Sequence, residues 1–525
     1  MTIPSSHHNS QVDDAIALPS KGRFGINLTA NLAYFGLNIL VGLWLTPYLI
    51  RHLGVAAYGM VPLAITATSY LGLFTTSLNS AVVPFMIIAV DKQDPVEANR
   101  IFNTFFWSTA AILIILLGPM LYLSLQAHLF FNVPVGYEEQ FVVLFLCSLG
   151  IYFLTTLSSS FGIATYCLNR FDLSNMVNTV GLFARVAAIL MLFNLYVPKV
   201  WHVGLAMSIS AVVGLVLSVI IWRQLLPKLK VERSFFSGPV FAKLTSMVGW
   251  MLINHIGVLL FLSIDLVVVN KLLGAEAGGK YGALILWSVM LRSLACVTGG
   301  VFRPPIASFY GRQDMPGLIA YTRRAIKFVG LMIALPIGLI CGFAQPLLRI
   351  WLGPVFEPLA PLMILMCLHL SVNLMVLPLI DLQVASNHVR LPGILTFFMG
   401  IGNLGLALLL AGPVGWGMYG VAAAGAIVMS AKNVVFTPLY GAQMLGVEYR
   451  TFYREIFPVI GITLVSSVAG WWLAQNLQIN TWLALGLAGL CVGGVFALVT
   501  YHLFLTKEER LYALSLVLGA RTSTP

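Results

Sequence analysis

The chain is built from long apolar runs separated by short polar segments. A helix needs about 20 apolar residues to cross the hydrocarbon core of a bilayer, and such runs recur from Ile26 to Leu505. The second and eighth runs are long enough to tilt, or to bend at Pro84 and Pro304. We predict about fourteen transmembrane helices, at 26–49, 57–89, 101–126, 140–164, 174–197, 202–222, 244–270, 281–309, 325–347, 359–383, 391–411, 417–441, 457–476 and 481–505.

Composition supports this interpretation. The 525 residues are 59% hydrophobic and 9% charged, whereas a soluble domain carries about 25% charged residues. We therefore expect an all-α polytopic membrane protein. The six cysteines lie inside apolar stretches, which favours small hydrophobic side chains over disulfides or metal ligands. Residues 1–25 are polar and lack a cleavable secretory signal, so they are expected to form a disordered tail.

The distribution of basic residues predicts the orientation. With the N-terminus in the cytoplasm, the inner loops and tails hold 20 of the 29 Lys and Arg residues, and the predicted spans hold four. The outer loops hold five, which are Arg51, Lys199, Lys271, Lys280 and Arg349. Such a bias follows the positive-inside rule, so both termini are predicted to be cytoplasmic. The protein would lie in a bacterial cytoplasmic (inner) membrane.

A weak repeat of 220 residues relates the two parts of the chain. Aligning 51–94 with 271–314 gives identities at Leu53/Leu273, Gly54/Gly274, Ala57/Ala277, Gly59/Gly279, Ile65/Ile285, Leu71/Leu291, Pro84/Pro304, Gln93/Gln313 and Asp94/Asp314. The repeat predicts two parallel six-helix halves whose binding site lies where they meet. The expected domains are a tail (1–25), an N-terminal half (26–222), a basic cytoplasmic linker (223–243), a C-terminal half (244–441), two extra helices (442–505) and a cytoplasmic tail (506–525).

Short motifs in both halves follow the order found in a known group of transporters. They are Asn31, Pro47-Tyr48-Leu49-Ile50-Arg51-His52-Leu53-Gly54 and Tyr58-Gly59 in the first half, then Ile264-Asp265, Leu273-Gly274, Gly279-Lys280-Tyr281 and Trp351-Leu352-Gly353. Over about residues 24–505 the chain resembles bacterial polysaccharide flippases, the O-antigen translocase branch of the multidrug/oligosaccharidyl-lipid/polysaccharide exporter superfamily. Such proteins often carry an arginine late in span 2. This chain has Val83 there, while the repeat partner Arg303 keeps an arginine.

Two glycine motifs suggest nucleotide binding but lack its context. The run from Gly274 to Lys280 fits a phosphate-binding loop, yet Tyr281 stands where a Mg²⁺-binding Ser or Thr belongs. The motif Gly415-Trp-Gly417-Met-Tyr-Gly420 has no strand before it. Basic residues do not cluster on one face as nucleic-acid binding requires. We therefore expect no cofactor and no nucleic-acid partner.

Ionisable groups inside spans are costly and mark functional sites. Four cations, Arg185, Arg292, Arg303 and Lys432, exceed two intramembrane acids, Asp265 and Asp381. The surplus predicts an anionic ligand, and arginine suits phosphate oxygens bidentately; the alternative is structural ion pairs or snorkelling near an interface. Arg292 and Arg303 would share one face of a helix. Asn178 and Arg185, which are seven residues apart, would also share one face. Asn27, Asn31, Tyr34 and Asn38 form one polar stripe.

The leading hypothesis is a transporter, not an enzyme, that flips a polyprenyl-pyrophosphate-linked oligosaccharide to the outer leaflet. The predicted substrate-binding residues are Arg292, Arg303, Arg185, Lys432, Asn27, Asn31, Tyr34 and Asn38, with Asp265, His255 and Asp381 as candidates for proton or sodium coupling. For His255 and His369, hydrogen-bonded packing is the other interpretation. Membrane lipids, glycosyltransferases and a glycan polymerase are the expected partners. Alternatives are a flippase for the peptidoglycan lipid precursor, a cation-coupled drug antiporter, and a membrane glycan polymerase or ligase.

Overall fold

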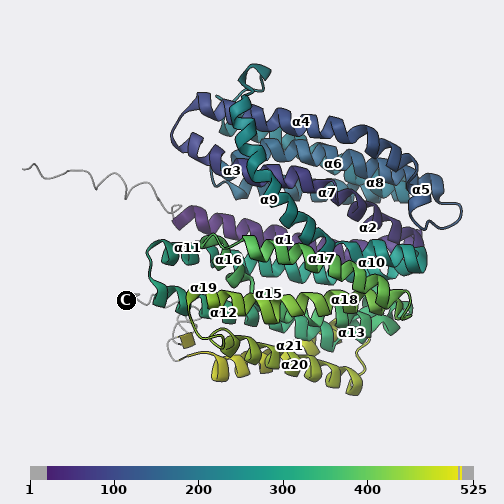
Figure 1. Cartoon of the computed structure of the whole chain (residues 1–525). Helices are drawn as coiled ribbons and strands as arrows, with labels where there is room; N and C mark the ends of the chain where they lie inside the picture. The colour runs from purple at the N-terminus through teal and green to yellow at the C-terminus, as the bar shows by residue number, and fades with distance from the viewer. Residues whose placement is uncertain (1–20, 507–508, 511–525) are drawn as a thin grey trace, which may run out of the picture. The chain divides into compact units, whose positions relative to one another are not determined.

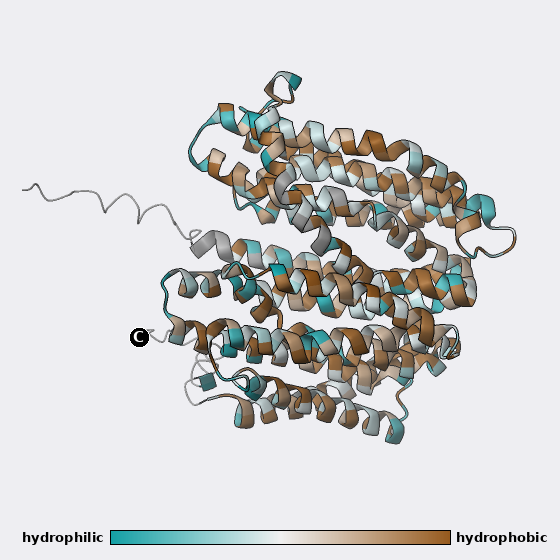
Figure 2. Cartoon of the chain, viewed as in Figure 1, coloured by the Kyte–Doolittle hydropathy of each residue, from teal (hydrophilic) through white to brown (hydrophobic). Residues whose placement is uncertain are grey.

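Helices make up all the regular structure in the part of the chain that the computed structural model describes, residues 21–506 and 509–510 (Figure 1). This confirms the all-α prediction. Twelve of the described helices are long and apolar enough to cross a membrane. Hydrophobic residues extend along most of the helices, with hydrophilic residues mainly towards their ends (Figure 2). The pattern is typical of helices whose middle sections face lipid.

The chain divides into two compact units. The described residues of the first unit are 21–45, 67–130 and 135–252, and those of the second are 46–66, 131–134, 253–506 and 509–510. The boundaries pass through α1, α2 and α9. The predicted six-helix halves and their boundaries at 223–243 stay a prediction.

The first unit contains most of the helices before residue 253. They are α1 (Lys21–Leu53, as far as Leu45), α3 (Gly72–Asp91), α4 (Pro95–Leu125), α5 (Ala127–Phe130), α6 (Glu138–Cys167), α7 (Phe171–Leu195), α8 (Val200–Leu225), η2 (Arg233–Phe235) and α9 (Gly238–Leu262, as far as Leu252).

The second unit contains the rest of the described chain. Its helices are α2 (Val55–Ser69, as far as Thr66), α10 (Ile264–Gly300), α11 (Arg303–Gly311), α12 (Met315–Gly342), α13 (Ala344–Leu352), η3 (Pro354–Leu359), α14 (Ala360–Leu368), α15 (Leu370–Met375), α16 (Leu377–Ala385), α17 (Arg390–Ala411), α18 (Gly417–Ser430), η4 (Ala431–Phe436), α19 (Thr437–Leu445), α20 (Tyr453–Asn476), α21 (Trp482–Val499) and η5 (Thr500–Phe504).

Aromatic stacking and small residues hold the helices together. In the first unit, Trp222 of α8 contacts Phe102 of α4 and Phe161 of α6, with ring centroids 5.3 Å apart in both pairs. In the second unit, α12 and α20 approach closely, because a Cβ at Gly338 would lie 2.7 Å from the Cβ of Ser466. The hydrophobic driving force between helices is weak in lipid. Small residues at such crossings allow the close van der Waals packing that drives helix association instead.

Several predicted segments break where hydropathy alone shows no interruption, among them the second, seventh and eighth. The second segment divides into α2 and α3 at Tyr70 and Leu71, whereas Pro84 lies inside α3. Turn hydrogen bonds from Leu71 N to Thr68 O and from Leu73 N to Tyr70 O replace the helical ladder there. This break precedes Pro84, and a bend at Pro84 itself stays a prediction.

The breaks in the seventh and eighth segments lie at Ser263 and Val301–Phe302. The first places Asp265 in the first turn of α10. The second comes directly before Arg303-Pro304, which confirms a bend near Pro304, as expected from a proline ring that cannot continue a helix. It also means that Arg292 and Arg303 lie on separate helices. The prediction that they share one face of a continuous helix is wrong.

Local backbone geometry follows the 220-residue repeat. Gly54 and Gly274 both have a positive φ, at 83° and 89°, and Gln93 and Gln313 do too, at 53° and 57°. Asp94 then caps α4 by accepting from Val96 N and Glu97 N. Its repeat partner, Asp314, caps α12 by accepting from Gly317 N. The two copies therefore keep the same turn and the same helix start.

Within the second unit, repeat-related residues also contact one another. A Cβ at Gly59 would lie 2.6 Å from Gly279 Cα and 3.2 Å from Ala275 O. A Cβ at Gly279 would meet Val55 O, and Val55 is the repeat partner of Ala275. Such reciprocal contacts define a local two-fold relation between α2 and α10, by the same logic as a symmetric dimer interface.

Candidate functional site

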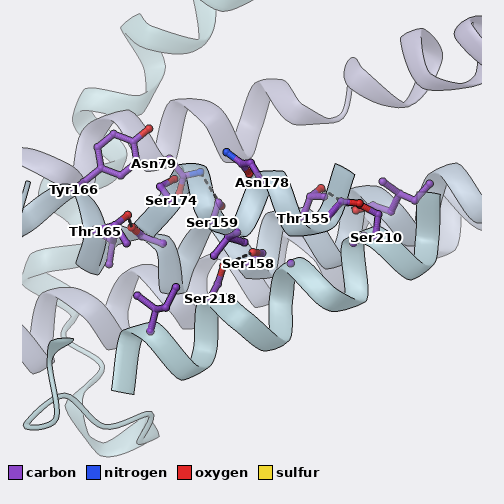
Figure 3. Close-up of a pocket in the computed structure, with 18 of the residues that line it drawn as sticks. Asn79, Thr155, Ser158, Ser159, Thr165, Tyr166, Ser174, Asn178, Ser210 and Ser218 are labelled. Carbon is purple, nitrogen blue, oxygen red and sulfur yellow. Dashed lines mark hydrogen bonds between the residues drawn. The ribbon is translucent and has the colours of Figure 1, made fainter. Parts of the chain in front are cut away.

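A polar cavity of about 660 Å³ lies among α1, α3, α6, α7 and α8 of the first unit (Figure 3). Among the described residues, Arg185 is the charged residue in its lining and no carboxylate belongs to the lining. The hydroxyl and amide side chains that line it are Tyr34, Asn38, Thr76, Asn79, Ser80, Thr155, Ser158, Ser159, Thr165, Tyr166, Ser174, Asn178, Ser210 and Ser218. A wall of this kind suits a ligand rich in hydroxyl groups that carries an anion.

Helical periodicity brings these side chains to one place. On α6, Thr155, Ser159 and Tyr166 follow at intervals of four and seven, so they share a face. On α8, Ser210 and Ser218 are eight residues apart, with Gly214 between them. A Cβ at Gly214 would meet nothing within 4 Å, so the glycine leaves room inside the cavity.

Hydrogen bonds between helices hold the wall in place. Ser158 Oγ and Ser218 Oγ are 2.9 Å apart, linking α6 to α8. Asn79 Nδ2 donates to Ser159 Oγ at 3.0 Å, linking α3 to α6, and both pairs are visible in Figure 3. Ser210 Oγ donates to the Gly181 carbonyl at 2.7 Å. A hydroxyl that donates its proton in this way keeps its acceptor lone pairs for a ligand.

Arg185 on α7 is the unusual member of the cavity. Its Nε is buried, with no hydrogen-bond partner among the described residues. Burying an unpaired polar group of a cation is costly unless a ligand supplies the partner. Asn178, one of the cavity residues, lies seven residues earlier on the same helix face, as the spacing predicts. The guanidinium is therefore placed to bind an anion beside the hydroxyl groups.

The polar residues of α1 fall into two groups by their contacts. Asn27 and Asn31 are structural: Asn27 Nδ2 donates to the Asn169 carbonyl at 2.9 Å, and Asn31 Oδ1 accepts from Asn175 Nδ2 at 2.5 Å. Tyr34 and Asn38, further along, line the cavity. The expectation that this stripe turns towards protein or a cavity is met at all four positions.

In the second unit, Asp265 lies in a buried polar cluster. Its Oδ2 accepts from Tyr281 Oη at 3.2 Å, while its Oδ1 is buried without a hydrogen-bond partner among the described residues. Asn403 Oδ1 is also buried without a hydrogen-bond partner among the described residues. A Cβ at Gly425 would lie within 4 Å of the side chains of Asp265 and Asn403. Arg292 interacts electrostatically with Asp265 and donates from Nη1 to Met429 Sδ at 3.7 Å.

The other predicted site residues belong to the second unit and are not among the lining residues of the polar cavity. Arg303 Nε donates to Asp381 Oδ1 at 2.7 Å; the arginine side chain is 70% exposed and the carboxylate 8%. Lys432 is on η4, a π-helical turn, and His255 is on α9. His369 Nδ1 lies 2.8 Å from Asn373 Nδ2, as hydrogen-bonded packing requires. Substrate roles for Arg292, Arg303 and Lys432 stay predictions.

Sequence reasoning missed most of the cavity wall because it followed ionisable groups. The hydroxyl residues of α3, α6 and α8 carry no charge, and single serines are common in spans, where they donate to the carbonyl four residues earlier. A usable signal was present in the spacing of Ser210, Gly214 and Ser218. Small and polar residues at intervals of four mark a helix face that does not contact lipid.

Comparison with known proteins gives the family. Residues 24–309 match the model of the family described as polysaccharide biosynthesis protein. The chain is 35% identical over 492 residues to an uncharacterized membrane protein, EpsK, of Bacillus subtilis (strain 168), covering 93% of this chain and 97% of that protein.

Solved structures share the fold. The lipid II flippase MurJ in an inward closed conformation superposes with a TM-score of 0.64 at 14% identity, covering 90% of this chain and 98% of that one. An inward-facing multidrug resistance MATE family transporter of the MOP superfamily gives 0.62 at 15%, covering 81% and 97%. The expected resemblance is confirmed: the chain, which shares the fold of these two solved structures, belongs to the polysaccharide biosynthesis protein family.

Proposed function

We propose that the protein flips a polyprenyl-pyrophosphate-linked oligosaccharide from the inner to the outer leaflet of the cytoplasmic membrane by alternating access. The observation that carries the proposal is the polar cavity of the first unit, which combines many hydroxyl and amide groups with Arg185. Sugar hydroxyls exchange hydrogen bonds with such a wall, and the guanidinium binds a phosphate or an acidic sugar. The polyprenyl tail stays in lipid during the crossing.

The lining disfavours a cation-coupled drug antiporter. A cationic drug needs a carboxylate partner in a low-dielectric site, and the polar cavity has none. A glycan polymerase or ligase is disfavoured by the fold, because the solved structures that share it are a lipid II flippase and a multidrug resistance transporter. A flippase for the peptidoglycan precursor remains the second candidate, because the lipid II flippase MurJ shares the fold over 90% of this chain.

Reconstitution tests the proposal directly. Purified protein in liposomes receives a fluorescent polyprenyl-pyrophosphate oligosaccharide, and a membrane-impermeant glycosidase reports the fraction that crosses. We expect Arg185→Ala to lower the flipping rate by about tenfold, since losing a charge-assisted hydrogen bond costs roughly 1.5–3 kcal/mol. Arg185→Lys should recover it in part, because the bidentate fork is lost. Arg100→Gln, an exposed cation of the same unit paired with Glu97, is the matched control.

Two results would contradict the proposal. Wild-type flipping in Arg185→Ala would remove the cavity from the substrate path. Faster flipping of the peptidoglycan precursor than of a lipid-linked oligosaccharide without peptide would favour the second candidate. We further expect glycosyltransferases to supply the substrate and a glycan polymerase to consume it.

Ion coupling is proposed for the second unit. Asp265 and Asn403 present unpartnered buried oxygens, the atoms that a sodium ion or a proton would meet. If coupling acts there, Asp265→Asn should abolish the dependence of flipping on a sodium or proton gradient while substrate binding persists. Substitutions of His255 and Asp381 serve as the comparison. If one of them abolishes the dependence on the gradient while Asp265→Asn keeps it, the coupling site lies at that residue and not at Asp265.

A further inference from the structure

The segment that joins α8 to α9 is held to the first unit by side chains of α4. Asn99 Nδ2 donates to Lys228 O at 3.1 Å, and Asn99 Oδ1 accepts from Lys230 N at 2.9 Å. One turn later, Asn103 Nδ2 donates to Lys230 O at 2.7 Å, and Asn103 Oδ1 accepts from Glu232 N at 2.8 Å. Both asparagines are buried. Their amides therefore pair with the segment as a neighbouring β-strand would.

This pairing decides which side chains face outwards. Hydrogen bonds at every second residue mean that side chains alternate between two sides of the segment. Leu229 packs into the core beside Phe102 and Trp222. Lys228 and Lys230 are exposed. The side chain of Lys230 is 69% exposed, and its Nζ lies 4.0 Å from Glu232 Oε1, an exposed ion pair that water screens. The exposed lysines are thus carried on a backbone whose conformation is already fixed.

Apolar side chains of the same segment are also exposed. Val231, Phe236 and Phe241 are 38%, 44% and 41% exposed, and the two phenylalanine rings contact each other. Arg233, also exposed, lies between them in the sequence. The segment directly follows α8, an apolar helix long enough to cross a membrane, so it lies close to the membrane boundary. Lysine and arginine interleaved with aromatic and aliphatic residues are typical of surfaces that insert among lipid headgroups.

We propose that residues 228–241 form a binding surface for anionic phospholipid headgroups. Lys228, Lys230 and Arg233 contact the phosphates, and Val231, Phe236 and Phe241 enter the acyl boundary. Because Asn99 and Asn103 hold the backbone beforehand, binding orders little of the chain, which favours affinity. The proposal is independent of the transport function and of the orientation predicted for the membrane.

Lipid titration of the full-length protein in detergent, followed by native mass spectrometry, tests the surface. The probes are phosphatidylglycerol and the zwitterionic phosphatidylcholine. We expect the triple variant Lys228→Gln, Lys230→Gln, Arg233→Gln to bind phosphatidylglycerol at least about tenfold more weakly, with phosphatidylcholine binding unchanged. The control Arg51→Gln, Lys271→Gln, Arg450→Gln removes the same charge from other exposed positions and should keep wild-type binding.

A second variant separates the effect of the fixed backbone on lipid binding from the effect of the charge. Asn103→Ala keeps every cation but removes two of the hydrogen bonds to the segment. We expect faster hydrogen–deuterium exchange at the amide of Glu232, which loses its acceptor, while Lys230 N keeps its bond to Asn99 Oδ1. Phosphatidylglycerol binding should be weaker. Equal binding by the wild type and the triple variant would overturn the proposal, as would equal losses in the triple variant and the control. A triple variant that loses affinity for a short-chain prenyl diphosphate but keeps phosphatidylglycerol would assign the surface to the transported lipid instead.

Discussion

Glycines keep the polar cavity open. A Cβ at Gly162 or Gly214 would meet no atom within 4 Å, although both residues belong to the lining. The space in front of them is therefore part of the cavity volume. Their role is to be small, because neither has the positive φ that would require glycine.

Gly214→Leu tests this role. We expect the leucine side chain to occupy the cavity and lower lipid-linked oligosaccharide flipping by roughly tenfold, equivalent to a steric cost of about 1.4 kcal/mol. The thermal unfolding midpoint in detergent should stay near that of the wild type. Gly461→Leu is the matched control, because Gly461 on α20 also has open space around its Cβ but lies outside the cavity. Equal flipping in both variants would exclude Gly214 from the substrate path.

The Arg303–Asp381 pair allows a structural role to be separated from substrate binding. Asp381 is buried and Arg303 is its cation, so Arg303→Ala leaves a buried carboxylate unpaired. After allowance for the exposed arginine, we expect a stability loss of about 1 kcal/mol. Adding Asp381→Asn should restore the unfolding midpoint. If flipping returns as well, the pair is structural; if flipping stays low in the stable double variant, Arg303 contacts substrate.

At the scale of elements, helix crossings depend on single backbone contacts. At Gly59 a Cβ would lie 2.6 Å from Gly279 Cα, so α2 and α10 must separate before any side chain fits. We expect Gly59→Ala to lower stability by about 1–3 kcal/mol, the usual cost of overpacking. Thermal unfolding in detergent measures it, and Gly36→Ala on α1, with nothing within 4 Å of its Cβ, is the control. Equal unfolding midpoints would contradict the crossing.

An ion pair holds the end of the described chain to α12. Lys327 Nζ donates to both carboxylate oxygens of Glu509, and both side chains are largely buried. Burial is the largest single effect and acts to raise the pKa of Glu509. The hydrogen bonds from Lys327 and Thr506 and the charge of Lys327 together outweigh it, so this pKa is lowered from 4.5. A carboxyl whose folded pKa is lowered stabilises the attached state above its ordinary pKa and loses this stabilisation as the pH falls through the folded pKa.

The attachment should therefore weaken below about pH 4.5. Limited proteolysis across a pH series, with an acid-active protease, should show cleavage near residue 506 rising as the pH falls. Glu509→Gln should show high cleavage at every pH, since it lacks the charge throughout. Wild-type cleavage that is independent of pH between 5 and 3 would contradict the role of the ion pair.

Hydropathy predicts where helices occur because burying or lipid-solvating twenty apolar residues is a large and local effect. It does not predict where they break. The break at Ser263 lies inside an apolar run and depends on tertiary packing, whereas the one at Val301–Phe302 is marked by Pro304. In the same way, Arg185 was predictable because charge inside a span is rare. Ser158 and Ser218 were not, because their roles depend on which helices lie opposite.

At the scale of the whole molecule, the repeat and the basic residues are separate arguments about architecture. The repeat is supported by the matching turns at Gly54 and Gly274 and by reciprocal contacts at Gly59 and Gly279. These describe how parts of the chain fold and meet, and they say nothing about which side of the membrane each turn faces. Orientation depends on how the 29 Lys and Arg residues are distributed between the loops on the two sides. The two arguments therefore need different experiments.

Cysteine labelling tests the orientation. In a variant with the six native cysteines replaced, a single cysteine is placed either at Glu276, on α10 after the Gly274 turn, or at Glu232, in the segment held by Asn103. Both side chains are exposed, at 68% and 48%, so a difference between them reports the membrane and not burial. An impermeant maleimide added to intact cells should modify Glu276→Cys and leave Glu232→Cys unmodified until the cells are opened. The reverse pattern would place both termini outside and would remove the basis for export from the cytoplasmic leaflet, because the basic linker would then face away from the compartment where the substrate is made.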